Sequence, residues 1–81
     1  MRLASDRFYR TDVVKLLVLQ GQTRRVPHRR YSYESAGRLY DVDVRESDGS
    51  RSYHVNGSFE SEPAAVHREI ERHFELAEVA P

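Results

Sequence analysis

The 81-residue chain contains no cysteine. This excludes a disulfide framework, a thiolate nucleophile and a thiolate metal site, and it is typical of a reducing compartment. The longest apolar stretch, residues 13–19, is interrupted by Lys15 and is too short to cross a bilayer. The first ten residues carry charges where a signal peptide needs an apolar core. The sequence therefore predicts a cytoplasmic protein without a membrane segment.

Sequence signatures of catalysis and cofactor binding are also missing. The chain has no Gly-rich phosphate loop, no nucleophile elbow and no paired zinc motif. His67 and His73 are six residues apart, a spacing that does not bring two ligands together on a helix. We therefore expect no enzymatic activity, no metal site and no cofactor.

The charges that are present are unevenly distributed. Charged residues make up 32% of the chain and apolar residues 38%, so the length and composition predict one domain, 1–81, with a thin core. The net charge is zero, but residues 1–38 hold nine basic and three acidic side chains, and residues 39–81 hold four basic and ten acidic ones. The two halves are expected either to neutralise each other or to attract different partners.

The first element is predicted between Thr11 and Gly21. Thr11 is a suitable N-cap and Gly21 a suitable C-terminal glycine, which favours a helix. Because Val13, Val14 and Val18 are β-branched, a buried strand remains an alternative prediction for residues 12–20. Residues 22–28 are predicted to form a loop, because Pro27 blocks regular hydrogen bonding and the segment is crowded with arginines.

From Arg29 the pattern alternates with a period of two, which predicts three antiparallel strands. The turns are expected at Ala36-Gly37 and Asp48-Gly49, and Asn56-Gly57 is expected to end the sheet. One face of this sheet would carry the apolar members of the alternation: Tyr31, Tyr33, Tyr40, Val42, Val44, Tyr53 and Val55.

A last helix is predicted from an N-cap at Ser61 to about Glu78. Its apolar face would hold Val66, Ile70, Phe74 and Ala77, with Arg68, Glu71, Arg72 and Glu75 facing away. The predicted fold class is therefore α+β: a two-layer α-β-β-β-α domain in which both helices pack on one face of a three-stranded antiparallel sheet.

This predicted order resembles the topology of double-stranded-RNA-binding domains and of the small HicA-type toxin ribonucleases. The resemblance implies RNA binding or RNA cleavage, but it is confined to topology. The last helix begins with Glu60-Ser-Glu-Pro where the RNA-binding family has a Lys-rich phosphate clamp. A loop with Val26-Pro-His-Arg-Arg stands where the toxins carry a Gly-Ser-His-type motif on the first strand.

One candidate site lies on the polar face of the predicted sheet. Two-residue turns would place Arg30 opposite Asp43 and Asp43 opposite His54, with Ser32, Asp41 and Asn56 in the neighbouring row. A carboxylate beside an imidazole would raise the pKa of the histidine and prepare it for acid/base chemistry. Cross-strand ion pairs on a solvated sheet face explain the same residues structurally, and we favour that interpretation.

The densest charge feature is the segment 24–30, which we predict to be the principal binding surface. It could contact phosphates and stack on bases, dock on an acidic protein surface, or pair with the chain's own acidic helix. Because the second half of the chain carries six net negative charges, a protein partner is favoured over a nucleic acid. The candidate binding residues are Arg24, Arg25, His28, Arg29, Arg30 and Tyr31.

The sequence thus predicts a non-catalytic interaction module, a small regulator, inhibitor or adaptor that binds a protein partner with an acidic surface. The first alternative is a nucleic-acid-binding protein that uses the arginine segment 24–30. The second is a small toxin-like ribonuclease that uses His28 or His54.

Overall fold

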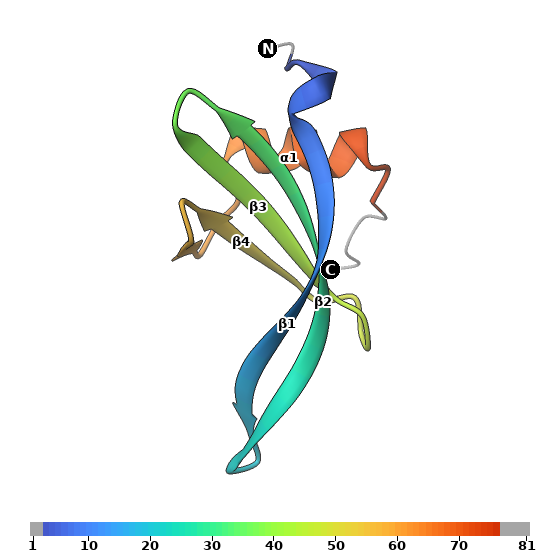
Figure 1. Ribbon diagram of the computed structural model, residues 1–81, viewed down its shortest axis with the longest axis vertical. Coiled ribbons are helices and arrows are strands. Elements are labelled where there is room, and N and C mark those ends of the chain that lie inside the picture. Colours follow the sequence, from blue (N-terminus) through green and yellow to red (C-terminus); the bar gives the residue numbers. More distant parts are fainter. Residues whose placement is uncertain (1–2, 77–81) are drawn as a thin grey trace.

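The computed structural model describes residues 3–76 and contains a five-stranded antiparallel sheet and one C-terminal helix (Figure 1). The strands are neighbours in sequence order, β1-β2-β3-β4-β5. The predicted α-β-β-β-α order with three strands is therefore wrong. The elements are a 3₁₀ turn η1 (Ser5–Arg7), β1 (Phe8–Leu19), β2 (Gln22–Ser35), β3 (Arg38–Arg45), β4 (Arg51–Val55), β5 (Ser58–Glu60) and α1 (Ala65–His73).

The segment predicted as a first helix is strand β1, the alternative left open for residues 12–20. Its β-branched residues favour the extended chain. Thr11, predicted as the N-cap, lies within β1 and pairs with Arg30 of β2. Gly21 does not end a helix: Gln20 and Gly21, with φ of 52° and 76°, form the two-residue turn between β1 and β2. Positive φ at both turn positions is the type I′ geometry that matches the twist of a hairpin.

Residues 22–28, predicted as a loop, are the first half of β2. Pro27 pairs with Val14 of β1. Antiparallel pairs alternate between those that exchange two hydrogen bonds and those that exchange none, and a proline without an N–H fits only the second kind. On the side of β2 that faces β3, the strand pairing begins only at His28, opposite Arg45. Within the described residues, Pro27 therefore has no strand partner on that side that would need its N–H. The proline is tolerated because its position requires no donor.

The connection between β3 and β4 is longer than the predicted two-residue turn. Arg45 N–H donates to the Ser50 carbonyl and Gly49 N–H donates to the Arg45 carbonyl, at 2.8 Å each, so the pair Arg45/Ser50 closes the loop. The register therefore pairs Asp43 with Ser52 and not with His54. A slip of two residues changes the partners but leaves each side chain on its predicted face.

The sheet also continues beyond Asn56-Gly57, which was predicted to end it. These two residues, with φ of 51° and 82°, form another two-residue turn that leads into β5. The predicted turn at Ala36-Gly37 and the pairing of Arg30 with Asp43 are confirmed.

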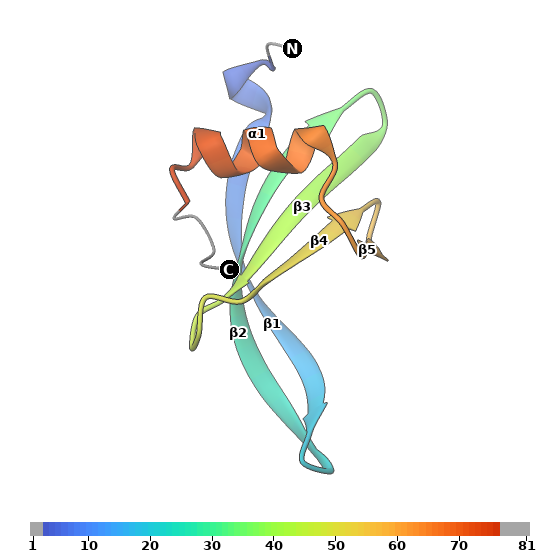
Figure 2. The same cartoon turned by 180° about the vertical axis from the view of Figure 1, so that it is seen from behind.

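Helix α1 packs across one face of the sheet (Figure 2), the predicted Tyr/Val face. Tyr31, Tyr33, Val42 and Ile70 form the buried core, and the partly buried Phe8 and Phe74 join it from β1 and from the end of the helix. The core is narrow because the helix has only nine residues and covers ~14 Å, whereas β1 extends for ~40 Å.

The helix begins at Ala65 rather than after Ser61, and a histidine takes the place of a side-chain cap. The fully buried His67 accepts the Ala64 N–H at Nδ1, at 2.8 Å, and its Nε2 lies 2.9 Å from the His54 carbonyl. Since Nδ1 accepts, Nε2 must carry the proton and donate. This neutral tautomer ties the start of the helix to β4. The prediction that the helix runs to about Glu78 is wrong: α1 ends at His73, and Glu75, with a φ of 53°, turns the chain out of the helix.

Ile70 is fully buried at the centre of this core, and Ile70→Ala is expected to reduce the free energy of unfolding by ~2–5 kcal/mol, because it removes packed methyl groups and leaves a cavity. Urea denaturation followed by circular dichroism measures this loss. The matched control is Leu16→Ala on β1, where the side chain is 68% exposed and the expected change is within ~0.5 kcal/mol. Equal losses in the two variants would contradict this assignment of the core.

Candidate functional site

The polar face of the sheet holds a buried carboxylate surrounded by cationic side chains. Asp43 is completely buried on β3. Its oxygens accept hydrogen bonds from Arg30 Nε at 2.8 Å and Arg30 Nη2 at 3.1 Å, and Lys15 Nζ lies 2.6 Å from Oδ2. His54 Nε2 lies 3.5 Å from the same Oδ2. The predicted grouping of Arg30, Asp43 and His54 therefore forms, although His54 reaches Asp43 diagonally and Lys15 was not predicted to join them.

Curvature of the sheet buries this face, which α1 does not cover. In a flat sheet β1 and β4 would lie three strand spacings apart, ~14 Å, which is farther than a lysine side chain reaches. Lys15 of β1 nevertheless donates to Ser52 Oγ of β4 at 3.3 Å. The twisted strands β1 and β2 thus curl over the face on which Asp43 lies.

The electrostatics of this cluster do not prepare a histidine for catalysis in the predicted way. Burial is the largest influence on His54 and lowers its pKa; Asp43 opposes this effect, and the positive charges of Lys15 and Arg30 add to it. The predicted increase in its pKa is therefore wrong. Burial by itself would raise the pKa of Asp43, but the hydrogen bonds from Arg30 and Lys15 prevail and lower it. Asp43 is a stable carboxylate with both oxygens occupied, beside a histidine that favours its neutral form.

The predicted neighbouring row is only partly present. Ser32 Oγ donates to Asp41 Oδ1 at 2.6 Å, and both residues are buried. Asn56 does not join them, because it lies in the turn before β5, where its Oδ1 accepts the Leu39 N–H at 2.8 Å. The geometry favours a structural role for the polar face, since its two buried carboxylates, Asp41 and Asp43, are engaged by donors from neighbouring strands.

The six predicted binding residues do not form one surface. Strand alternation sends Arg24, His28 and Arg30 to the polar face and Arg25, Arg29 and Tyr31 to the face that carries the helix. Four of them are engaged within the chain itself. His28 is buried, with its Nδ1 2.9 Å from the Val26 carbonyl, and Tyr31 packs in the core. Arg30 is bound to Asp43, and Arg29 Nε lies 3.5 Å from Glu46 Oε1.

The same segment, however, belongs to a projecting structure that the sequence did not predict. Strand pairing between β2 and β3 begins at His28, so residues 14–27 form a two-stranded ribbon that extends away from the helix (Figure 1). We call these residues the arm. Val14, Leu16 and Val18 lie on one face of it, with exposed fractions of 60%, 68% and 73%. Their cross-strand partners are Pro27, Arg25 and Thr23.

A second charged cluster, also not predicted, lies where α1 meets β4. Glu71 was expected to face solvent, but it is buried and accepts hydrogen bonds from Arg51, Arg68 and Tyr53. Arg51 lies on the same face of the sheet as Tyr53, the face that the helix covers. Because burying an unpaired charge is costly, an arginine on this face needs a carboxylate partner, and the helix is the element that can supply it. This alternation was the signal in the sequence that could have identified Glu71.

Comparisons with known proteins give no family for this chain: no family model matches it, and neither a curated protein nor a solved structure is significantly similar to it. Within residues 3–76, no three His, Asp or Glu side chains are arranged to hold a metal ion. In the same part of the chain, no helix is long and apolar enough to cross a membrane.

Stability is expected to depend on pH through His54. Its pKa is lowered in the folded chain from an ordinary value of 6.5, so the unfolded chain takes up this proton first as the pH falls. The contribution to stability is complete above that value and is lost as the pH falls towards the pKa of the folded state. Urea denaturation between about pH 5 and 8 should show a decline in wild-type stability that is smaller in His54→Gln. Parallel pH profiles for the two proteins would refute the lowered pKa.

Asp43→Asn is expected to lower the free energy of unfolding by ~3–5 kcal/mol, because it leaves Lys15 and Arg30 beside a neutral amide. Chemical denaturation at neutral pH measures the loss. Asp12→Asn, at an exposed position of β1, is the matched control and should change stability by no more than ~0.5 kcal/mol. A change of that small size at Asp43 would show that the cluster does not hold the sheet together.

Proposed function

We propose that this chain is a non-catalytic protein-interaction module, a small regulator, inhibitor or adaptor, and that the arm is its binding surface. The observation that carries the proposal is the exposure of Val14, Leu16 and Val18 on one face of the arm. Fully burying an aliphatic side chain contributes ~1.5–3 kcal/mol, so a partner that covers all three gains a substantial part of a binding free energy. Exposed apolar patches of this kind are typical of interaction sites.

The main chain of β1 supports binding of an extended segment. Because the Val14–Pro27 pair exchanges no hydrogen bonds, alternation directs the N–H and C=O groups of Val14, Leu16 and Val18 away from β2. In the described part of the chain, β1 is an edge strand with β2 as its only neighbour. An extended segment of another protein can add to this edge as a further strand, with its own apolar residues against the exposed aliphatic side chains.

The charge of the arm favours an acidic partner. Residues 14–27 include Lys15, Arg24 and Arg25 and no acidic residue. Lys15 is engaged by Asp43, whereas Arg25 is exposed and lies directly across from Leu16. An acidic segment with alternating apolar residues therefore complements both the exposed stripe of Val14, Leu16 and Val18 and the positive charge of Arg25 beside it.

The environments of the neighbouring residues support a protein partner over a nucleic acid. Tyr31 packs in the core, so it offers no exposed ring for a base to stack on. Arg29 and Arg30 are close to carboxylates of the chain itself. Only Arg24 and Arg25 of the segment 24–30 are exposed arginines without a carboxylate partner among the described residues, and they point to opposite faces of the arm.

A fluorescein-labelled peptide of alternating Glu and Val residues tests this proposal. Its anisotropy should rise on addition of the protein, and Leu16→Thr should weaken binding about tenfold, because a loss of ~1.4 kcal/mol follows when one of the aliphatic contacts is removed. Threonine preserves strand propensity, so the fold should be retained. Phe59→Thr on β5 is the matched control: this side chain is 67% exposed but lies outside the arm, and its removal should leave binding unchanged.

Two outcomes would overturn the proposal. One is equal binding of a peptide in which Lys replaces each Glu, since charge complementarity then plays no part. The other is tighter binding of a single-stranded oligonucleotide that depends on Arg24 and Arg25 and falls steeply with salt, because this would identify phosphate as the ligand.

A further inference from the structure

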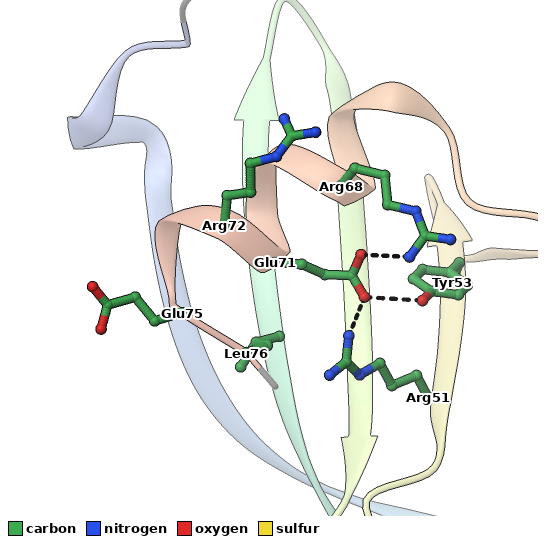
Figure 3. Close-up of a pocket in the computed structure, with 7 residues that line it drawn as sticks. All are labelled: Arg51, Tyr53, Arg68, Glu71, Arg72, Glu75 and Leu76. Atoms are coloured by element: carbon green, nitrogen blue, oxygen red, sulfur yellow. Dashed lines mark hydrogen bonds and ion pairs between the residues drawn. The ribbon is translucent and has the colours of Figure 1, made fainter. Parts of the chain in front are cut away.

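An open pocket of about 710 Å³ lies between β4 and α1, apart from the arm and from the polar face (Figure 3). Arg51 and Tyr53 line it from the sheet, and Arg68 and Glu71 line it from the helix. The side chains of Arg51 and Glu71 are only 9% and 8% exposed, whereas Arg68 is 55% exposed at the entrance.

The charges inside this pocket do not balance. The Glu71 carboxylate accepts hydrogen bonds from Arg68 Nη1 at 2.9 Å, from Tyr53 Oη at 3.0 Å and from Arg51 Nη1. Figure 3 shows the two guanidinium groups converging on this one carboxylate, while Arg72 and Glu75 point away from it. Arg72 and Glu75 also line the pocket, so its lining carries three positive and two negative charges, and one positive charge is in excess.

Arg51 also has unused hydrogen-bonding capacity. A guanidinium group has five N–H donors in a planar fork that fits an oxyanion. Nε of Arg51 is buried and has no hydrogen-bond partner within residues 3–76. A buried donor without a partner is costly, and such groups occur where an ion or water completes the site.

We propose that this pocket binds a phosphate group, held between the guanidinium groups of Arg51 and Arg68. The pocket is larger than inorganic phosphate, and the Tyr53 ring and Leu76 supply apolar wall beside the charged groups. The ligand class is therefore a small organic phosphate whose apolar part lies against Tyr53. This site is independent of the arm and does not rest on its proposed function.

NMR titration of the arginine Nε–Hε resonances tests this site, with inorganic phosphate and phenyl phosphate as the probes at constant ionic strength. Both probes should shift the resonances of Arg51 and Arg68, and phenyl phosphate should bind more tightly because its ring reaches Tyr53. Arg68→Gln should weaken binding about tenfold, the size expected for loss of one charge-assisted hydrogen bond. Arg38→Gln, at an exposed position at the start of β3, is the matched control and should bind as the wild type does.

The experiment does not depend on the buried Arg51, whose replacement would leave Glu71 with fewer partners and could unfold the chain. Unchanged Arg51 and Arg68 resonances at millimolar phosphate would overturn the proposal. So would equal affinity of the wild type and Arg68→Gln, or shifts confined to Arg24 and Arg25, which would show that phosphate contacts the arm only. Tighter binding of inorganic phosphate than of phenyl phosphate would overturn the assignment to an organic phosphate.

Discussion

The curvature of the sheet depends on one buried carboxylate. Asp43 on β3 binds Lys15 from β1 and Arg30 from β2, so a single side chain connects three strands across the polar face. Removing a charge from water costs several kcal/mol, and this cost is offset only when the partners are close and well oriented. Arg30 lies directly opposite Asp43 on the neighbouring strand, whereas Lys15, two strands away, reaches Asp43 only because the sheet curls. This requirement accounts for a buried polar face on a sheet whose helix α1 packs on the other side.

The arm follows from unequal lengths in the same sheet. β1 and β2 have 12 and 14 residues, but β3, β4 and β5 shorten to eight, five and three. The nine-residue helix covers only the part where several strands lie side by side. The face that carries Tyr31 and Tyr33 continues along β1 as Val14, Leu16 and Val18, where nothing in the described chain covers it. The exposed stripe is thus the core face of the sheet extended beyond its core.

Residue alternation made part of this fold predictable from the sequence. The inward-facing residues from Tyr31 to Val55, the turn at Ala36-Gly37 and the pairing of Arg30 with Asp43 depend on local pattern, and the structure confirms them. Pattern could not show that Gly21 serves a hairpin and not a helix end, because glycine meets both requirements. The loop after Arg45 is longer than a two-residue turn, and its length decides that Asp43 pairs with Ser52. The dipeptide Asp48-Gly49 predicts a turn but not how many residues the turn contains. Lys15 at Asp43 and the exposure of the arm result from curvature and strand length, which are properties of the assembled sheet.

The sequential strand order means that the first strands of this chain are made well before the elements that cover them. Each of β2 to β5 pairs with the strand before it, so the sheet is built from hairpins between segments that follow one another in the sequence. Each hairpin can form while the next is still being synthesised. Lys15 and Ser52, 37 residues apart, meet only after β4 has emerged, and Ile70 closes the core later still. During synthesis on the ribosome, β1 and β2 therefore expose both the future core and the arm, and the nascent chain is most prone to misassociation until α1 is complete.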